Sequence, residues 1–320
     1  MICNLTIYSR RKYACKFSHV NADTHNDTEA IMKKLAFIKR SAGSHWVGDG
    51  FPVRSIFSYN DIAEEMSPFL LMDYAGPTRF EPTTQRRGVG AHPHRGFETV
   101  TIVYAGGVSH RDSAGGGGTI GPGDVQWMTA ASGILHEEFH SPDYGRAGGP
   151  FEMIQLWVNL PARDKMRTPG YQSIVDGQIP RADLPDSAGS VRVIAGQYEN
   201  AAGAAHTFSP MNVWDMRLNA GRTVALDLPD GYTTALFVLQ GSVRVDGHAV
   251  HPAELAVMER AGTRLRFDVA EDTVLLLLNG EPLDEPIAAY GPFVMNTREE
   301  ITQAMRDYET GRFGRMAPAA

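Results

Sequence analysis

Short apolar runs interrupted by glycine and proline make up most of this chain from Leu35 onward, which favours short extended segments. The 320 residues include 33 glycines and 19 prolines. Such punctuation is typical of antiparallel sheets joined by tight turns. We therefore expect an all-β protein, with strands at Val53–Tyr59, Phe69–Tyr74, Thr99–Tyr104, Val125–Thr129, Met153–Val158, Val191–Ile194, Val213–Leu218, Val224–Leu228, Thr234–Leu239, Leu255–Met258 and Val274–Leu278.

The strand-like runs form two sets on either side of residues 161–190, a polar stretch with four prolines. A length of 320 residues allows two domains at roughly 100–200 residues each. The halves also resemble each other, since Thr101–Gly107 parallels Leu236–Ser242 and Pro122–Met128 parallels Pro252–Met258. We expect a disordered or non-native extension at 1–31 with Met32 as the start, an N-terminal domain at 32–165, a linker at 166–190, a C-terminal domain at 191–295, and a helix and tail at 296–320.

Charge and cysteine content exclude several classes of function. The net charge of −7 and the pI near 5.9 leave no broad positive field for direct nucleic-acid binding. No window approaches the roughly 18 consecutive apolar residues of a membrane span. Both cysteines, Cys3 and Cys15, lie near the start, so the body has neither a disulfide framework nor a CxxC metal site. We expect a cytoplasmic protein that binds neither nucleic acid nor membrane.

Two short motifs, HPH at residues 92–94 and HEE at 136–138, predict a metal site. Each places two ligand-type side chains at positions i and i+2, which share one face of a strand. His92, His94, His136 and Glu138 together suit a first-row divalent ion and leave two of six coordination positions free. The N-terminal domain is therefore expected to bind metal.

The C-terminal half has lost these ligands. Aligning the two halves replaces His92 and His94 by Asp227 and Pro229, and His136 and Glu138 by Leu265 and Phe267. The expected architecture is a duplicated β-barrel with one metal site.

Longer motifs resemble the pirins, a branch of the cupin superfamily. They are HPHRGFETVTIVYAGG at 92–107, SHRDS at 109–113, PGDVQWMTAASGILHEE at 122–138, QLWVNLP at 155–161 and GPFVMNTREEI at 291–301. The resemblance implies two tandem jelly-roll cupin barrels packed face to face, with one mononuclear iron bound by His92, His94, His136 and Glu138. Fe2+ is the expected ion, with Mn, Co, Ni, Cu or Zn as alternatives, because such ligands do not select among divalent metals.

Four further residues near the motifs have more than one interpretation. The general cupin pattern places a glutamate four residues after the second histidine, which makes Glu98 an alternative ligand or a support for one. We favour Glu138. His110 could orient a ligand, although stabilising a loop is the simpler role; Gln155 could face the cavity or simply line the barrel; and His140 is expected at the surface or supporting a ligand.

The C-terminal segment predicts a short helix. Thr297 and Glu300 form a capping box, Ile301, Met305 and Tyr308 recur at helical spacing, and Gly311 is placed to end the helix. We expect its apolar stripe to pack on a barrel.

Two functions fit these observations. In the first, the pirin resemblance implies a quercetin 2,3-dioxygenase, in which Glu138 takes the hydroxyl proton of a flavonol-like chelating substrate and dioxygen opens the ring. In the second, the iron is a redox switch in a regulator that binds a transcription factor or metabolic enzyme. The open coordination positions favour the enzyme.

Overall fold

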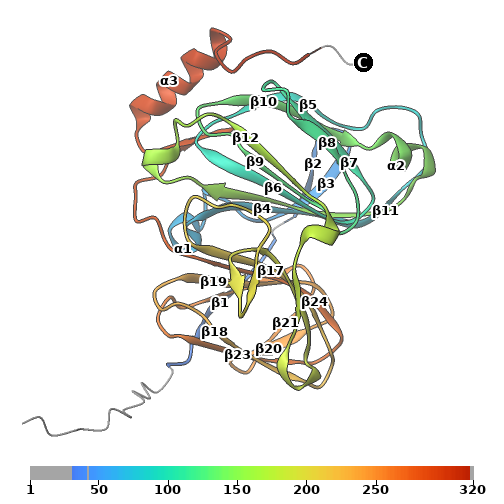
Figure 1. Ribbon diagram of the computed structural model, residues 1–320, viewed down its shortest axis with the longest axis vertical. Coiled ribbons are helices and arrows are strands. Elements are labelled where there is room, and N and C mark those ends of the chain that lie inside the picture. Colours follow the sequence, from blue (N-terminus) through green and yellow to red (C-terminus); the bar gives the residue numbers. More distant parts are fainter. Residues whose placement is uncertain (1–30, 42, 318–320) are drawn as a thin grey trace, which may run out of the picture. The chain divides into compact units, whose positions relative to one another are not determined.

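The computed structural model describes residues 31–41 and 43–317. The extension expected at 1–31 lies outside the described residues, apart from Ile31. Strands dominate, as expected, and form two barrels of two sheets each (Figure 1).

The N-terminal barrel combines a seven-stranded and a four-stranded sheet. The large sheet has the order β12 (Gly170–Ile174), β9 (Val125–Thr129), β6 (Phe97–Ala105), β11 (Gly149–Asn159), β4 (Phe69–Phe80), β3 (Phe51–Phe57) and β2 (Ser44–Val47). The small sheet has the order β5 (Gly88–His94), β10 (Ile134–His140), β7 (Val108–Asp112) and β8 (Gly117–Ile120).

The C-terminal barrel is built in the same way. Its seven-stranded sheet has the order β1 (Leu35–Arg40), β22 (Glu254–Met258), β19 (Thr233–Gln240), β24 (Thr273–Gly280), β17 (Met211–Leu218), β14 (Gly189–Ala195) and β13 (Arg181–Asp183). Its four-stranded sheet has the order β18 (Thr223–Asp227), β23 (Arg264–Val269), β20 (Val243–Val245) and β21 (His248–Val250).

The remaining elements are short. Two small strand pairs are β15 (Gln197–Tyr198) with β16 (Ala201–Ala202) and β25 (Ala288–Tyr290) with β26 (Phe293–Met295). The helices are α1 (Ala63–Met66), α2 (Pro142–Ala147) and α3 (Arg298–Glu309), with single 3-10 turns at Ala162–Asp164, Asp176–Gln178 and Pro185–Ser187. Within residues 31–41 and 43–317, no helix has the length and apolar character needed to cross a membrane.

The strand orders confirm the duplication expected from the sequence. The order β9-β6-β11-β4 in the first barrel corresponds to β22-β19-β24-β17 in the second, and β5-β10-β7-β8 corresponds to β18-β23-β20-β21. The repeated segments at Thr101–Gly107 and Leu236–Ser242 therefore occupy equivalent strands, β6 and β19.

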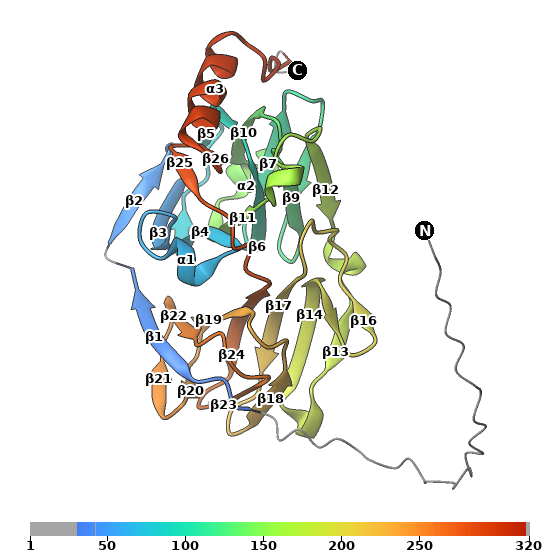
Figure 2. The same cartoon turned by 90° about the vertical axis from the view of Figure 1, so that its left-hand side faces the viewer.

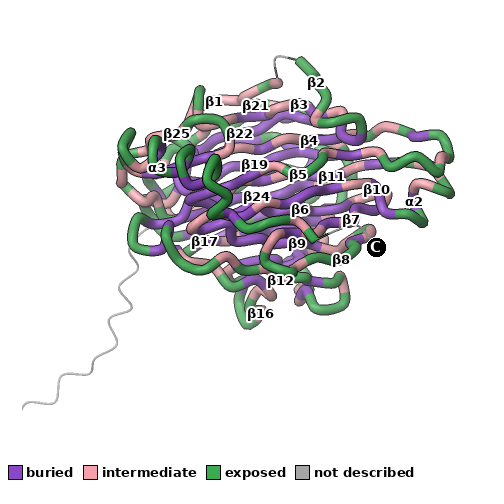
Figure 3. Tube along the Cα trace, turned by 90° about the horizontal axis from the view of Figure 1, so that it is seen from above, coloured by how far each residue is buried: buried purple, intermediate pink, exposed green. Residues whose placement is uncertain are grey.

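The two large sheets pack on one another through a shared apolar core. Val100 and Ile102 of β6 lie in one cluster with Phe237 of β19 and Leu278 of β24. Central strands such as β6 and β19 are consequently buried along almost their whole length (Figure 3). The apolar run of β19 follows from burial on both faces, whereas β18 alternates because one face meets solvent.

Three segments lie elsewhere than the expected domain limits imply. Strand β1 pairs with β22, so residues 35–40 belong to the sheet of the C-terminal barrel although they precede the N-terminal one (Figure 2). The stretch expected as a linker contains β12, which pairs with β9, and β13, which pairs with β14. All three segments cover strands that would otherwise be sheet edges with unpaired backbone groups.

Helix α3 begins and ends where the sequence predicts. The Glu300 backbone N–H donates to Thr297 Oγ1 at 3.2 Å, and Glu300 Oε2 accepts from the Thr297 N–H at 2.9 Å. The prediction that Ile301, Met305 and Tyr308 form a buried apolar stripe is wrong in part. Ile301 is buried, but Met305 and Tyr308 are 38% and 44% exposed, because the face against the barrel carries Ala304 and Asp307 instead.

Candidate metal centre

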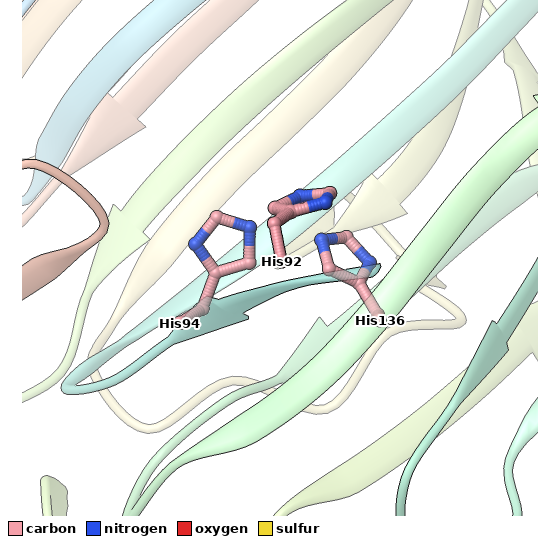
Figure 4. Close-up of side chains that lie close together, drawn as sticks. All are labelled: His92, His94 and His136. Atoms are coloured by element: carbon pink, nitrogen blue, oxygen red, sulfur yellow. The ribbon is translucent and has the colours of Figure 1, made fainter. Parts of the chain in front are cut away.

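Three imidazoles converge at the open edge of the small N-terminal sheet. His92 and His94 lie on β5 and His136 on β10, and the antiparallel register sets His136 opposite His92. Ring centroids are 4.2 Å apart for His92 and His136, 4.7 Å for His94 and His136, and 4.9 Å for His92 and His94. One nitrogen from each ring lies within 4.8 Å of the others, an arrangement that could hold a metal ion (Figure 4).

The hydrogen bonds of these rings suit metal ligation. His92 Nδ1 lies 2.8 Å from the Gly90 carbonyl and donates to it in the tautomer that leaves Nε2 available. His94 Nδ1 and His136 Nε2 are buried without a hydrogen-bond partner among the described residues. An unpaired buried polar atom costs about 1–3 kcal/mol, which coordination to a cation would offset. The donor set therefore fits a first-row divalent ion.

The electrostatics keep two of the imidazoles neutral. Burial lowers the pKa of His94 and of His136 well below the ordinary histidine value, and the neighbouring imidazoles lower it further. A neutral imidazole offers the lone pair that a metal requires, so the site is ready to bind without releasing a proton from these rings.

Glu138 lies beside only part of this cluster. A Glu138 carboxylate oxygen lies within 4.8 Å of a ring nitrogen of His136 and of one of His110. Glu138 does not belong to the group formed by His92, His94 and His136. A register shift between His136 and Glu138 sets Glu138 opposite Val89 of β5. Thr101 Oγ1, on β6 of the opposite sheet, lies 3.4 Å from Glu138 Oε1.

Glu98 faces away from the imidazoles. Glu98 lies three positions before Thr101 on β6, so the two side chains project from opposite faces of the strand. Glu98 shares its face with Val100 and Ile102, on the side of the core between the barrels. Its Oε1 accepts from Thr129 Oγ1 at 2.7 Å, and burial raises its pKa to about 7. Although Glu98 follows His94 by four positions, the two side chains do not share a strand face, because β5 ends at His94 and β6 begins only at Phe97.

His110 lies much closer to the site than the sequence indicated. On β7 it pairs with Glu138, and its Nδ1 is 3.3 Å from His136 Nδ1. Its Nε2 is 3.7 Å from Asp112 Oδ2, and its ring stacks on Tyr171 with an interplanar angle of 4°. These contacts place His110 beside His136, on a strand and not in a loop.

A row of polar side chains crosses the sheet face that carries Thr101. Gln126 and Gln155 are its cross-strand neighbours, and Gln155 is followed by Asp73 on β4. Thr101 Oγ1 donates to Gln155 Oε1 at 2.8 Å, so these two side chains lie on the same face of the sheet. Gln126 is fully buried, and neither of its amide atoms has a partner among the described residues. Sequence reasoning missed Thr101 and Gln126, although their alternation with Val100 and Val125 was a usable signal.

His140 is a packing residue. It is 8% exposed, so the surface position considered for it is wrong. Its Nε2 lies 2.8 Å from the Gly50 carbonyl, and its ring contacts Phe80 and Phe151 edge-on or tilted. It does not reach the three clustered imidazoles.

Comparison with known proteins identifies the family. The model of the Pirin family matches residues 50–158, and the model of the Pirin C-terminal cupin domain matches residues 213–314. A Pseudomonas aeruginosa protein named "putative quercetin 2,3-dioxygenase" is 60% identical over 282 residues, which cover 88% of this chain and 99% of that protein.

Solved structures agree with this assignment. A crystal structure of quercetin 2,3-dioxygenase from Acinetobacter baumannii is 53% identical, with a TM-score of 0.87 over 89% of this chain and 100% of its own. The Escherichia coli pirin YhhW in complex with nickel(II) shares the fold at 18% identity, with a TM-score of 0.60 over 77% of this chain and 99% of its own. The chain belongs to the pirin family, and its fold is that of a bicupin.

Proposed function

We propose that this protein is a metal-dependent dioxygenase of the quercetin 2,3-dioxygenase type, acting on flavonol-like chelating substrates. The observation that carries the proposal is the cluster of His92, His94 and His136, in which two buried ring nitrogens have no partner among the described residues. The names of the Pseudomonas and Acinetobacter relatives supply the substrate class.

The proposed ligands are His92, His94, His136 and Glu138. His92 would be held by Gly90, and His136 by His110, so that each ring presents a fixed nitrogen to the ion. The proposed ion is one Fe2+ per chain, with Mn, Co, Ni, Cu and Zn as alternatives that the ligand types do not exclude. Bound there, the ion would supply Lewis-acid polarisation of the chelating oxygens and a common template for substrate and dioxygen.

Glu138 has the proposed role of general base. Its carboxylate would accept the proton of the substrate's 3-hydroxyl. Thr101 Oγ1 lies beside this carboxylate, 3.4 Å from Oε1, and gives its single proton to Gln155 Oε1 at the shorter distance of 2.8 Å. Ring opening would incorporate both atoms of dioxygen and release carbon monoxide.

The test is aerobic incubation of the metal-loaded protein with quercetin, following substrate absorbance and carbon monoxide release. Fe, Mn, Co, Ni and Cu forms are compared. We expect turnover with at least one metal and a fall in kcat of about 100-fold or more for Glu138→Gln, the scale of losing a general base. His248→Ala, which removes an exposed imidazole from the C-terminal barrel, is the matched control and should act like wild type.

Absence of turnover with every metal would reject the enzyme. It would favour the alternative, a non-enzymatic iron-dependent redox-sensing regulator that binds a protein partner.

We also propose a cytoplasmic location, because the two cysteines leave the body without disulfides. Cell fractionation tests it, and recovery from an extracellular fraction would contradict it.

A further inference from the structure

The turn that follows His94 is bound by segments distant in sequence. The Arg95 N–H donates to the Pro292 carbonyl at 3.2 Å, and the Val294 N–H donates to the Arg95 carbonyl at 3.0 Å. The Gly96 N–H donates to the Ala131 carbonyl at 2.8 Å. This turn therefore joins the last residue of β5 to the C-terminal segment of the chain.

These contacts matter because β5 is an edge strand. In its sheet it pairs with β10 alone, and His94 is its final residue. The ends of strands fray unless something else binds them, so pairing with β10 is a weak support for the His94 ring. The C-terminal segment supplies the missing support, since α3 and β26 lie beside β5 (Figure 2).

A buried ion pair connects the turn to α3. Arg95 Nη1 lies 2.9 Å from Asp307 Oδ2, and their side chains are only 4% and 9% exposed. Arg95 Nε donates to the Ser132 carbonyl at 2.7 Å, and the guanidinium lies 4.6 Å from the centre of the Phe313 ring. With two bonds in different directions and an aromatic ring beneath it, the Arg95 side chain is held in one position.

Asp307 is itself held firmly. Its Oδ1 accepts from Gln303 Nε2 at 2.8 Å and from Arg312 Nη1 at 3.0 Å. The helix that carries it is anchored by Ile301 and Ala304 against Phe293. Asp307 therefore offers a rigid acceptor for Arg95.

Lys165 also hydrogen-bonds this turn, from another side. Its ammonium donates to the Gly96 carbonyl at 2.7 Å, to the Val294 carbonyl at 3.0 Å and to Asn159 Oδ1 at 2.6 Å. The packing here is close, because a Cβ at Gly96 would lie 1.9 Å from the Val294 carbonyl oxygen. The turn can shift only if the C-terminal segment shifts with it.

We propose that Asp307 is a positioning residue for the metal centre, acting through Arg95 on the turn that sets the place of His94. The proposal rests on the metal site of the proposed function but not on the reaction. Asp307 touches neither metal nor substrate in this role; it determines how tightly and in what geometry the ion is held.

The chain contains a matched control for the substitution Asp307→Asn. Asp215, in the C-terminal barrel, also lies between one buried arginine, Arg192 at 2.6 Å, and one more exposed arginine, Arg217 at 2.6 Å. Asp215→Asn therefore removes the same charge from the same kind of network, away from β5. Both variants should lose stability in urea unfolding, because each removes a buried carboxylate that contacts a buried guanidinium, although Arg192 keeps a second carboxylate, Asp176, at 2.7 Å.

Metal binding separates the two variants. We measure the affinity for Co(II) by chelator competition and record the visible absorption of the bound ion. Asp307→Asn should lose about tenfold or more in affinity, the scale for loss of an outer support to a ligand, and should change the absorption spectrum. Asp215→Asn should match wild type in both measurements.

Two results would overturn the proposal: wild-type affinity and spectrum in Asp307→Asn, or an equal affinity loss in Asp215→Asn. If Asp307→Asn fails to fold, Arg95→Lys replaces it; this variant keeps the charge but loses the planar fork. It should show a smaller affinity loss and an altered spectrum, and wild-type behaviour would equally overturn the proposal. If the wild-type protein binds metal but does not turn over quercetin, the proposed dioxygenase function is rejected. The proposal for Asp307 can still be tested, because it depends only on metal binding.

Discussion

At the scale of single residues, strand parity decided which acidic side chain meets the imidazoles. Glu138 follows His136 within one continuous strand, so the i, i+2 relation applies and its carboxylate lies near His136. Glu98 is separated from His94 by the turn at Arg95 and Gly96, which resets the direction of the side chains. Spacing in sequence predicts a shared face only where no turn intervenes.

Substituting His136 by alanine should remove the metal. His136 belongs to both candidate ligand groups, so its loss disrupts each of them. We expect metal content to fall from about one ion per chain to below about 0.1 in elemental analysis, the scale of losing a primary ligand. The circular dichroism spectrum should stay that of a β protein. Unchanged stoichiometry would reject the assignment, and His248→Ala is again the control.

Glu98→Gln should change the pH dependence of stability but not the metal content. Burial raises the pKa of Glu98 from its ordinary value of 4.5 to about 7 in the folded state. The folded chain therefore keeps a proton that the unfolded chain loses, and the associated stability is complete below about pH 4.5 and lost as the pH rises through 7. A shift of this size corresponds to roughly 3 kcal/mol at most.

Urea unfolding at pH 5 and pH 8 tests this expectation. Relative to wild type, Glu98→Gln should be more stable at pH 8 than at pH 5. Glu309→Gln, on an exposed side chain of α3, should show no such difference. Loss of metal from Glu98→Gln would instead return Glu98 to the ligand set.

At the scale of elements, the strand β1 shows how an early segment stabilises a late domain. Its residues pair with β22 from Leu35 opposite Met258 to Arg40 opposite Glu254. Phe37 packs against the core shared by the barrels, while Leu35 and Ile38 pack on the interior of the C-terminal barrel. Nothing in the local pattern of β1 distinguishes this partner from one in the nearer barrel.

Truncation at two points should therefore have different effects. A chain beginning at Met32 keeps β1 and Lys33, whose ammonium donates to the Arg260 carbonyl at 2.7 Å, and should fold and bind metal normally. A chain beginning at Gly43 exposes the edge of β22 and should lose on the order of 3 kcal/mol of unfolding free energy, by the apolar area uncovered. Urea unfolding followed by fluorescence measures both. Equal stability of the two chains would show that β1 contributes little.

At the scale of the whole molecule, the two barrels differ in what fills them. Leu265 and Phe267, the counterparts of His136 and Glu138, are buried in an apolar cluster with Leu226 and Leu228. This interior is close-packed and offers no ligand at these positions. Both halves of the duplication therefore form a barrel, but among the described residues only the N-terminal barrel has the cluster of histidines that could hold a metal ion.

We expect one metal ion per chain at saturation. Elemental analysis of the fully loaded protein should give a stoichiometry near one, because Pro229, Leu265 and Phe267 replace three of the ligands in the C-terminal barrel and the fourth counterpart, Asp227, pairs with Arg264. His136→Ala should then bind close to none. A value near two in wild type, or a residual ion in that variant, would indicate a second site.

The sequence alone was enough to predict the central strands, the duplication and the motifs whose three histidines cluster. These features depend on short-range rules, since the alternation of strand residues, turn-forming glycines and an i, i+2 spacing are all read within a few positions. The pirin motifs added the arrangement of two cupin barrels. The place of β1, the position of Thr101 beside Glu138 and the link from His94 to α3 were decided only by the tertiary structure. Arg95 and Asp307 are 212 positions apart, and such contacts leave no local periodicity because they arise when whole sheets and helices pack.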